Sequence, residues 1–532
     1  MMKEIENPYV QYMYSYPHKT AYGSLKNVHL KDYLGELVDK QNSLYFHIPF
    51  CQYKCGYCNL FSVAGQSEKW MQDYVEAMER QAAQLSKALP EGVVFSDLTL
   101  GGGTPLILPE ALLGKIFSMA RQYFAFETDG HSVVVETSPN QTTREKLQLL
   151  KQEGVSRLSI GVQSFVEDEL AALHRFHDVD TARQALEAIR EMDFTCMNVD
   201  LIYGIPGQTM DSLLYSLMQV LEYEPEEIFI YPLYVKPGTY LYQQGAERGE
   251  ETFRMYHLVR QVLGEAGYQP HSMRRFVKVN DNRISNKNEA VDKWKAKKDG
   301  YQEYLKSLDH KVADKLEVRN RDYLEINFFN RSKIDNKDDS KNYECLENQV
   351  LNECQIRNKG EFEGHVNFKK NHDEERRKTL KYLPESLCGF GNTISIGCGG
   401  RSYIGNLHFC TPYAVRQKDC IARIKEYIGR TDYLQVPHGF LLSEDEQKRR
   451  YVIKHILFGK GVNCKDYREH FQSEVLEVFP QIKEWERDGY VTIEKDYITL
   501  TKEGFALSDY LGPKFISPKV REKTEEYYKE FM

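Results

Sequence analysis

The chain has 532 residues, of which 41% are hydrophobic, so it is long enough for one large domain and at least one smaller one. Its 70 basic and 78 acidic side chains give a formal net charge of −8, which creates no field that would gather nucleic acid or anionic lipid. The sequence has no apolar run long enough to cross a bilayer, and its start, MMKEIENPYVQYMYSYPHK, does not resemble a secretory leader. We therefore expect a cytoplasmic protein without nucleic-acid or membrane partners.

Residues 1–41 form a tyrosine-rich N-terminal segment, and a regular alternation of apolar runs and amphipathic stretches follows over residues 42–275. The alternation predicts six β-α units around a parallel sheet, with strands over 43–48, 95–100, 132–136, 157–160, 197–203 and 227–233. Helical patterns follow most of them, for example over 70–89 and 211–223. The predicted fold class is α/β, a partial (β/α)6 TIM-type barrel, with functional residues where the strands end.

The composition changes over residues 278–385, where Asn, Lys, Asp, Glu and Arg dominate and apolar residues are sparse. Such a stretch buries too little apolar surface to offset the entropy of ordering, so we expect an insertion of flexible loops or solvated helices. The segment could be a dispensable insertion or a lid over the substrate, and the sequence is compatible with both interpretations.

Residues 386–443 are compact again, and we expect them to form an extension that covers the barrel mouth. The order of patterns over 444–515 is helix, helix, strand, turn, strand and capping helix, which resembles an α+β winged-helix module. Its acidic surroundings favour a packing role over DNA binding, and the acidic residues are Glu474, Glu477, Glu484 and Glu486. Residues 516–532 form a tail.

Three cysteines, Cys51, Cys55 and Cys58, lie in a loop that leaves the first predicted strand. The CxxxCxxC spacing can direct three thiolates to three irons of a [4Fe–4S] cubane and leave the fourth iron open. The open iron can chelate S-adenosylmethionine (SAM), whose reductive cleavage gives a hydrogen-abstracting radical. A structural zinc site and a chance cluster are the alternatives, but no second CxxC or His pair supplies a fourth zinc ligand nearby.

The other cysteines lack the regular pairing of an auxiliary cluster, so we interpret them as buried thiols, with Cys388 and Cys398 the pair of most interest. Eleven cysteines at this low density suit a reducing compartment better than a disulfide framework. The full set outside the loop is Cys196, Cys345, Cys354, Cys388, Cys398, Cys410, Cys420 and Cys464.

A glycine run, Gly101–Gly103 followed by Thr104, ends the second predicted strand. Glycines there let backbone groups approach a ligand closely, although such a run is often only a turn. It lacks the Gly-Lys-Ser/Thr that would make it a phosphate loop.

Together these motifs resemble the oxygen-independent coproporphyrinogen III oxidase-like branch of the radical SAM superfamily. The resemblance covers residues 42–275 and 388–511. It rests on the strings LYFHIPFCQYKCGYC, LTLGGGTP, VVETSPN, LSIGVQSF, LHRFHDVDTA, VDLIYGIPGQT, YPLYVKPGT and GCGGRSY.

The resemblance implies a [4Fe–4S] cluster on the three loop cysteines and SAM on the residues around them. Tyr45 would flank the cluster and Tyr57 the adenine, while Gly102, Gly103 and Thr104 would hold the methionine end of SAM. The ribose and amino-acid parts would meet four polar residues near the strand ends: Glu136, Gln163, Arg175 and Asp200. From the residues alone, these four could also be caps and turns, Arg175 and Asp200 could be an ion pair, and His47 and His177 are expected to be structural.

The chain also departs from the oxidase pattern. Leu60 stands where the oxidase has a fourth cysteine, and the N-terminal YMYSYPHKTAYGSL differs from the segment that the family uses over its substrate. We therefore expect a less characterised subgroup rather than coproporphyrinogen oxidation itself. The branch includes haem chaperones and enzymes that use a second SAM for methylation, so the substrate and a second SAM stay open.

Two functions of different classes follow from this resemblance. The first is a radical SAM enzyme that abstracts hydrogen from a small-molecule substrate. The substrate would be related to tetrapyrroles, or the reaction would be of the methylation type. A flavodoxin- or ferredoxin-type protein would donate the electron. The second is a haem- or tetrapyrrole-binding chaperone that retains the cluster. The enzyme requires SAM cleavage that rises with substrate, whereas the chaperone requires stable haem binding.

Overall fold

The computed structural model describes residue 5 and residues 7–13, 15–249, 251–279 and 391–529. The predicted insertion over 278–385 falls outside these ranges except for its first two residues, as does Cys388. All segments discussed below belong to one compact unit of the chain.

Six parallel strands form the centre of the sheet, in the order in which they occur along the chain. Each contains one of the six predicted runs or nearly all of it. Their bounds are β2 Gln41–Ile48, β5 Val94–Gly102, β6 Ser132–Thr137, β7 Arg157–Gln163, β8 Cys196–Tyr203 and β9 Glu227–Pro232. The α/β fold class is confirmed.

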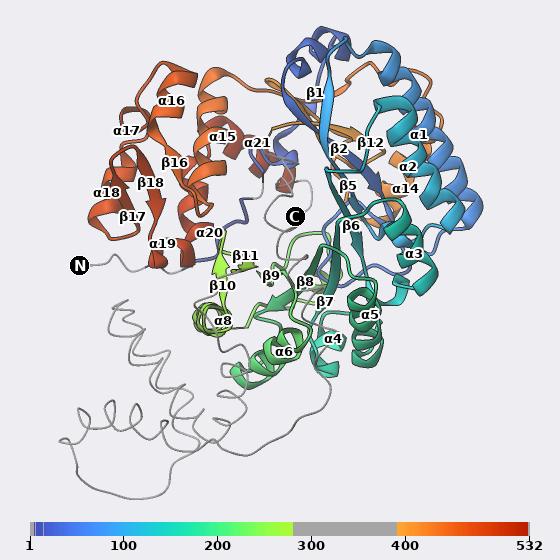
Figure 1. Ribbon diagram of the computed structural model, residues 1–532. Coiled ribbons are helices and arrows are strands. Elements are labelled where there is room, and N and C mark those ends of the chain that lie inside the picture. The colour runs from blue at the N-terminus through green and yellow to red at the C-terminus, as the bar shows by residue number, and fades with distance from the viewer. Residues whose placement is uncertain (1–4, 6, 14, 250, 280–390, 530–532) are drawn as a thin grey trace, which may run out of the picture. The chain divides into compact units, whose positions relative to one another are not determined.

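Helices follow the strands because apolar residues recur at helical spacing and polar side chains cap the first turns. Ser67, Thr143, Asp178 and Thr209 each accept a hydrogen bond from a backbone N–H in the first turn of the helix that they precede. The helices are α1 Glu68–Ala88, α2 Glu110–Phe124, α3 Arg144–Gln152, α4 Glu167–Ala172, α5 Val179–Glu191, α6 Met210–Glu222, α7 Tyr240–Gln243 and α8 Thr252–Glu265. Figure 1 shows α1, α2, α3 and α5 along one side of strands β2 to β7.

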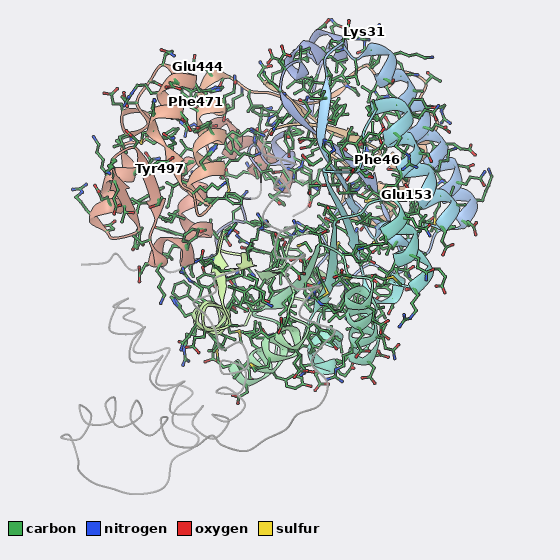
Figure 2. The ribbon with its side chains drawn as sticks, in the orientation of Figure 1. Lys31, Phe46, Glu153, Glu444, Phe471 and Tyr497 are labelled. Atoms are coloured by element: carbon green, nitrogen blue, oxygen red, sulfur yellow. The ribbon has the colours of Figure 1, made fainter. Side chains whose placement is uncertain are left out.

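The core lies between the strands and these helices. Leu44, Phe46 and Ile48 of β2 are fully buried, as are Val133 and Val135 of β6. Figure 2 shows Phe46 among the packed strands and helices, whereas Lys31 lies at the edge of the view. Because both faces of a parallel sheet are covered, its strands consist mostly of buried residues.

The sheet continues on both sides of the six strands. Within the described ranges it has thirteen strands in the order β1-β15-β14-β13-β12-β2-β5-β6-β7-β8-β9-β11-β10. Residues 391–443 contribute most of one side, with β12 parallel to β2, so this part of the predicted extension lengthens the sheet. The added elements are β1 Gly23–Ser24, β10 Tyr268–Pro270, β11 Arg275–Lys278, β12 Asn392–Ile396, β13 Ser402–Ile404, β14 Leu407–Phe409, α14 Gln417–Ile428 and β15 His438–Leu441.

The C-terminal domain has a separate three-stranded sheet in the order β16-β18-β17, packed with short helices (Figure 1, orange to red). Tyr497, labelled in Figure 2, lies in its hairpin. The elements are α15 Glu444–Ile456, β16 Val462–Asn463, α16 Cys464–Phe471, α17 Val475–Val478, α18 Gln481–Arg487, β17 Val491–Glu494, β18 Tyr497–Leu500, α19 Lys502–Ala506, α20 Ser508–Leu511 and α21 Pro518–Lys529. The domain boundaries given above stay predictions.

The C-terminal domain is joined to the barrel through the N-terminal segment. Arg274, which directly precedes β11, pairs with the buried carboxylate of Asp509, and the amide of Gln11 donates to the Asp509 carbonyl across 3.2 Å. Tyr16 donates to Glu446 of α15, and Ser517 donates to the same carboxylate across 2.7 Å. The described residues of the segment before β2 thus pack against the rest of the structure.

Candidate functional site

The loop that carries Cys51, Cys55 and Cys58 follows β2 and is held by several fixed contacts. Its first residues form the short strand β3 (Phe50–Cys51), which pairs with β4 (Val63–Ala64). The amide of Gly56 donates to the carbonyl of Leu173 across 2.9 Å, and the amide of Leu241 donates to the carbonyl of Gly56 across 2.9 Å. The loop is therefore fixed against the ends of α4 and α7.

Lys54, between the first two cysteines, is a further anchor that the sequence did not reveal. Its Nζ donates to the carbonyls of Ser62 at 3.1 Å and Val415 at 2.6 Å. These bonds join the cysteine loop to the segment before α14, more than 350 positions along the chain. Because an ammonium has three donors, one Lys can bind several carbonyls of a turn at once.

The three cysteine side chains are half-buried, and the ionisation of Cys51 is affected by both other sulfurs. Burial, together with the neighbouring Cys58 and Cys55, raises the pKa of Cys51 to about 12. Burial likewise raises the pKa of Cys58. Without a cation these thiols would stay protonated, whereas bound iron would deprotonate them.

Arg175 lies in the loop between α4 and α5. It donates from Nη1 to Cys55 Sγ across 2.9 Å and from Nη2 to the Gly161 carbonyl. Burial alone would lower its pKa, but Cys55 and Tyr57 raise it above the ordinary arginine value. The guanidinium therefore stays charged beside a cysteine sulfur. The Arg175–Asp200 ion pair considered from the sequence does not occur among the described contacts, because Asp200 accepts instead from Asn198 Nδ2 at 2.7 Å.

The glycine run packs tightly against its surroundings. A Cβ on Gly103 would lie 2.5 Å from the Phe50 carbonyl oxygen and 2.9 Å from Cys51 Sγ. Gly102, at φ +120°, would place a Cβ 2.6 Å from the His47 ring. Only glycine leaves room for the cysteine loop here, so these glycines are more than a turn.

The N–H groups of the glycine run are already bonded within the protein. Gly103 donates to the Ile48 carbonyl and Thr104 to the Phe50 carbonyl, both across 2.8 Å, and Gly102 donates to Glu136 Oε2 across 3.0 Å. A ligand at this turn would therefore meet carbonyl oxygens, which suit a donor such as an ammonium. Thr104 also lies beside the cysteine loop, with Oγ1 3.8 Å from Cys51 Sγ.

Two half-buried carboxyl groups, Glu136 on β6 and Asp200 on β8, lie close enough for Glu136 to affect the pKa of Asp200. Burial raises the pKa of Glu136, against the opposing effect of the Gly102 amide and Arg157. Burial and the proximity of Glu136 raise the pKa of Asp200 to about 7, although the bond from Asn198 opposes the rise. A positively charged ligand would stabilise the ionised form of both carboxyl groups and so lower their pKa values. Asn198 lies two residues before Asp200, on the same strand face.

Three further residues were predicted to contact the cofactors: Tyr45, Tyr57 and Gln163. Tyr45 Oη is 3.3 Å from His47 Nδ1, and a Cβ on Gly101 would lie 2.9 Å from that hydroxyl. Tyr57 packs on the apolar cluster of Leu173, Ile202, Ile205, Leu233 and Leu241. Gln163 is buried at φ +75°, where the β7–β8 register shifts.

His47 is buried beside Gly102, and its structural role stays a prediction. Its Nε2 lies 3.1 Å from the Phe61 carbonyl, and burial lowers the pKa of the ring to about 4. His177 is also buried, and burial together with Arg175 lowers its pKa to about 3. Both imidazoles are neutral at physiological pH.

A model of the radical SAM superfamily matches residues 45–218, and a model of the HemN C-terminal domain matches residues 442–507. The two matches occur in one chain, over the barrel and the C-terminal domain. Residues 45–218 are thus a radical SAM domain, and residues 442–507 are a domain of the HemN C-terminal kind.

The curated relatives include heme chaperones and oxygen-independent coproporphyrinogen III oxidases. The heme chaperone HemW of Bacillus subtilis is 32% identical over 245 residues, which are 44% of this chain and 64% of the relative. An oxygen-independent coproporphyrinogen III oxidase of Salmonella typhimurium is 27% identical over 283 residues, 51% of this chain and 62% of the relative. The matches thus span less than two thirds of each relative.

The solved structure of coproporphyrinogen III oxidase (HemN) from Escherichia coli, described as a radical SAM enzyme, superposes with a TM-score of 0.65 at 20% identity. The superposition covers 95% of this chain and 96% of that one. At this identity the likeness shows the fold. None of the helices in the described ranges combines the length and apolar character that a membrane crossing requires.

The radical SAM family implies a [4Fe–4S] cluster and SAM, and the donor set is of the right kind for both. Three thiols from one loop match three irons, and a charged guanidinium lies beside one sulfur. Within the described residues, no three His, Cys, Asp or Glu side chains converge on a single metal ion. A cubane requires no such convergence, because each iron takes its own thiolate.

Basic side chains pack on aromatic rings at two places, and one of these, at Lys19, is near Cys58. Lys19 Nζ lies 4.0 Å from the centre of the Tyr413 ring, and the Arg248 guanidinium lies 4.3 Å from that of Tyr9. Burial and the nearby Arg401 lower the pKa of Lys19 to about 7, while Cys410 and, to a smaller extent, Cys58 oppose the shift. Local sequence patterns do not reveal this grouping, because its members come from separate segments.

Lys236 belongs to the same group. Burial lowers the pKa of Lys236, as does the charge of Arg248, and the charges of Lys19, Arg401 and Lys236 add to burial in lowering the pKa of His18. Among the described residues, no carboxylate lies within salt-bridge distance of Lys19, Lys236 or Arg248. We refer to Lys19, Lys236, Arg248 and Arg401 as the cationic group.

Proposed function

We propose that the chain is a radical SAM enzyme that cleaves SAM reductively and abstracts hydrogen from an organic substrate bearing carboxylates. The product class, tetrapyrrole-related or methylated, stays open in this proposal. One observation carries it: the three thiols of the cysteine loop, the Arg175 donor and the Glu136–Asp200 carboxyl pair form one connected site.

The cofactors bring the bond-breaking chemistry: a [4Fe–4S] cluster supplies one electron, and SAM supplies the carbon–sulfur bond that yields a hydrogen-abstracting radical. Cys51, Cys55 and Cys58 would hold the cluster. Arg175 donates to the sulfur of Cys55 and keeps positive charge beside an electron-accepting site.

The polar residues of the site would orient SAM. Glu136 and Asp200 offer carboxylates to its positive charges, and the glycine turn offers carbonyl oxygens to its amino group. Tyr57 and its apolar neighbours offer a flat, dry surface of the kind that takes an adenine ring. These roles of Tyr45, Tyr57, Gly102, Gly103, Thr104, Glu136, Gln163, Arg175 and Asp200 are part of the proposal.

The cationic group supports an anionic substrate. For Lys19, Lys236 and Arg248, which have no carboxylate within salt-bridge distance among the described residues, burial of the charge is costly, and a carboxylate ligand would offset that cost. Tyrosines around them, including Tyr9 and Tyr413, supply flat apolar faces as well. A conjugated polycarboxylate fits this combination of charge and aromatic surface.

The test is anaerobic reconstitution with iron and sulfide, followed by dithionite and SAM. We expect 5′-deoxyadenosine from the parent protein and none from Cys55→Ala. A Cys55→Ala protein that produces it at the parental rate would refute the cluster assignment. Lys236→Ala should weaken binding of a porphyrin carboxylate by about tenfold, as expected for one lost charge-assisted contact.

A second candidate function is a haem-binding chaperone. The similarity to HemW of Bacillus subtilis, at 32% identity, favours it. It predicts stable haem binding and SAM cleavage that does not change when a substrate is added. The enzyme predicts that 5′-deoxyadenosine formation rises with substrate, so the same assay separates the two.

A further inference from the structure

Asn198 on β8 lies in a row of polar residues that crosses four strands of the sheet. It is 1% exposed, and in the parallel register it lies opposite Ser159 of β7 and Glu227 of β9. Ser159 lies opposite Glu136 of β6, which completes the row. Asp200 follows Asn198 by two positions, so both side chains leave the same face of β8.

The side-chain amide of Asn198 is fixed by two hydrogen bonds that it donates. Its Nδ2 donates to Ser159 Oγ across 2.6 Å and to Asp200 Oδ1 across 2.7 Å. Both N–H groups of the amide are therefore used. Because Ser159 is on the neighbouring strand, the amide is anchored on one side and restricts rotation of the Asp200 side chain on the other.

The amide oxygen of Asn198 indicates that packing does not explain this residue. Oδ1 is buried, and among the described residues no hydrogen-bond donor reaches it. A buried amide oxygen without a donor costs free energy. Leucine has a similar size and would avoid that cost, so the two donated bonds are what asparagine contributes at this position.

The bond from Asn198 opposes the other main influences on the Asp200 carboxyl group. Burial raises the pKa of Asp200 to about 7, the bond from Asn198 lowers it, and Glu136 raises it. A donor that bonds to a carboxylate stabilises the ionised form. Without Asn198, Asp200 would therefore stay protonated to higher pH.

Other charged or titratable side chains act on Asp200 as well. Arg157 lowers its pKa and Glu227 raises it, and these two are paired with each other across 2.6 Å. The tyrosines Tyr231 and Tyr57 also interact electrostatically with Asp200. Within the described ranges, however, the Asp200 carboxyl group accepts its side-chain hydrogen bond from Asn198 alone.

We propose that Asn198 is a positioning residue for SAM, which holds the Asp200 side chain in place and favours the ionised form that a positively charged ligand prefers. The inference rests on the proposed function, because that function gives Asp200 its contact with SAM. Asn198 acts through Asp200, since both of its N–H groups are used and its oxygen is buried.

SAM affinity as a function of pH tests this role. Equilibrium dialysis of the reconstituted protein against SAM is carried out from pH 6 to pH 9 with the parent, Asn198→Leu and Asn198→Ala. Both substitutions remove the donor, and leucine also keeps most of the side-chain volume. We expect the rise of SAM affinity with pH to move about one pH unit upward, because Asp200 loses a charge-assisted hydrogen bond. The dissociation constant should be about tenfold above the parental value at pH 6 and within about twofold of it at pH 9.

A packing role would give a different result. Loss of packing alone would weaken SAM binding by the same factor at every pH and would not displace the profile. A double-mutant cycle separates the two further. In an Asp200→Asn background, Asn198→Leu should change the SAM dissociation constant by less than about twofold, because the carboxyl group through which Asn198 acts is absent.

Asn42 provides a matched control, because it is a buried asparagine on another strand of the same sheet. It is 0% exposed, and its Nδ2 donates to three backbone carbonyls, those of Leu37, Lys40 and Val94. Asn42→Ala should lower the thermal stability but keep the parental pH profile of SAM binding. The iron content, measured in every variant, should match that of the parent.

Three results would each overturn the role of Asn198 while parental SAM binding leaves the proposed function intact. These are a parental pH profile in both Asn198 variants, an equal displacement in Asn42→Ala, and an undiminished effect of Asn198→Leu in the Asp200→Asn background. Absence of SAM binding by the parent at every pH would instead refute the proposed function, and this inference with it.

Discussion

The guanidinium of Arg175 donates from Nη1 to the Sγ atom of Cys55 across 2.9 Å, and it is anchored from its other side by the Gly161 carbonyl. One side chain thus connects the cysteine loop to β7. A hydrogen bond to a thiolate ligand stabilises the more negative, reduced form of an iron–sulfur cluster. Arg175 would therefore affect the reduction potential of the cluster.

Arg175→Met should make the cluster harder to reduce. We expect a more negative midpoint potential in an anaerobic titration followed by electron paramagnetic resonance, and dithionite-driven 5′-deoxyadenosine formation reduced roughly 10- to 100-fold. Arg175→Lys keeps the charge but cannot bond both the Cys55 sulfur and the Gly161 carbonyl. Its midpoint potential should therefore lie between those of the parent and Arg175→Met. An unchanged potential in Arg175→Met would show that the contact is only structural.

The loop cysteines should be essential one by one. Alanine at Cys51, Cys55 or Cys58 leaves one iron without its thiolate, so we expect iron and sulfide contents well below four per chain and no 5′-deoxyadenosine. Cys464→Ala is the control, since Cys464 lies in α16 of the C-terminal domain. If Cys464→Ala lost the cluster as well, the ligand assignment would need revision.

The six strands and their helices were predictable because they depend on local patterns. The run before the cysteines, 43–48, lies within β2, and the stretch 70–89 corresponds to α1. Buried parallel strands and capped amphipathic helices leave such signals in adjacent residues. The cysteine loop was found for the same reason, since its spacing is local.

The contacts between distant segments were not predictable. Strand β12 joins the sheet because Asn392 pairs with Asn42, and no local pattern encodes that register. Lys54 likewise depends on the Val415 carbonyl, and the cationic group assembles from four separate stretches. Such sites become visible only when the fold has brought their members together.

SAM affinity should depend on pH through Asp200. Its carboxyl pKa is raised to about 7, so the group is mostly protonated at pH 6 and mostly ionised at pH 8. Because SAM is positively charged and prefers the ionised carboxylate, its affinity should rise over this interval, at most about tenfold per pH unit. Equilibrium dialysis with the reconstituted protein measures this directly.

Asp200→Asn should bind SAM more weakly at pH 8 and show a flatter pH profile. Glu477→Gln, at an exposed position of the C-terminal domain, should keep the parental profile. A parental pH dependence in Asp200→Asn would assign the titration to another group, with Glu136 the next to examine because its pKa is also raised by burial.

Two glycine substitutions should have opposite effects. In Gly103→Ala the new Cβ would lie 2.5 Å from the Phe50 carbonyl oxygen and 2.9 Å from Cys51 Sγ, so the cysteine loop must shift. We expect a loss of about 1–3 kcal/mol in the free energy of unfolding and a reduced cluster content. In Gly114→Ala, within α2, the Cβ meets nothing within 4 Å, so the protein should gain about 0.5–1 kcal/mol. Thermal unfolding and iron content of both variants provide the comparison, and full cluster content in Gly103→Ala would contradict the close packing described here.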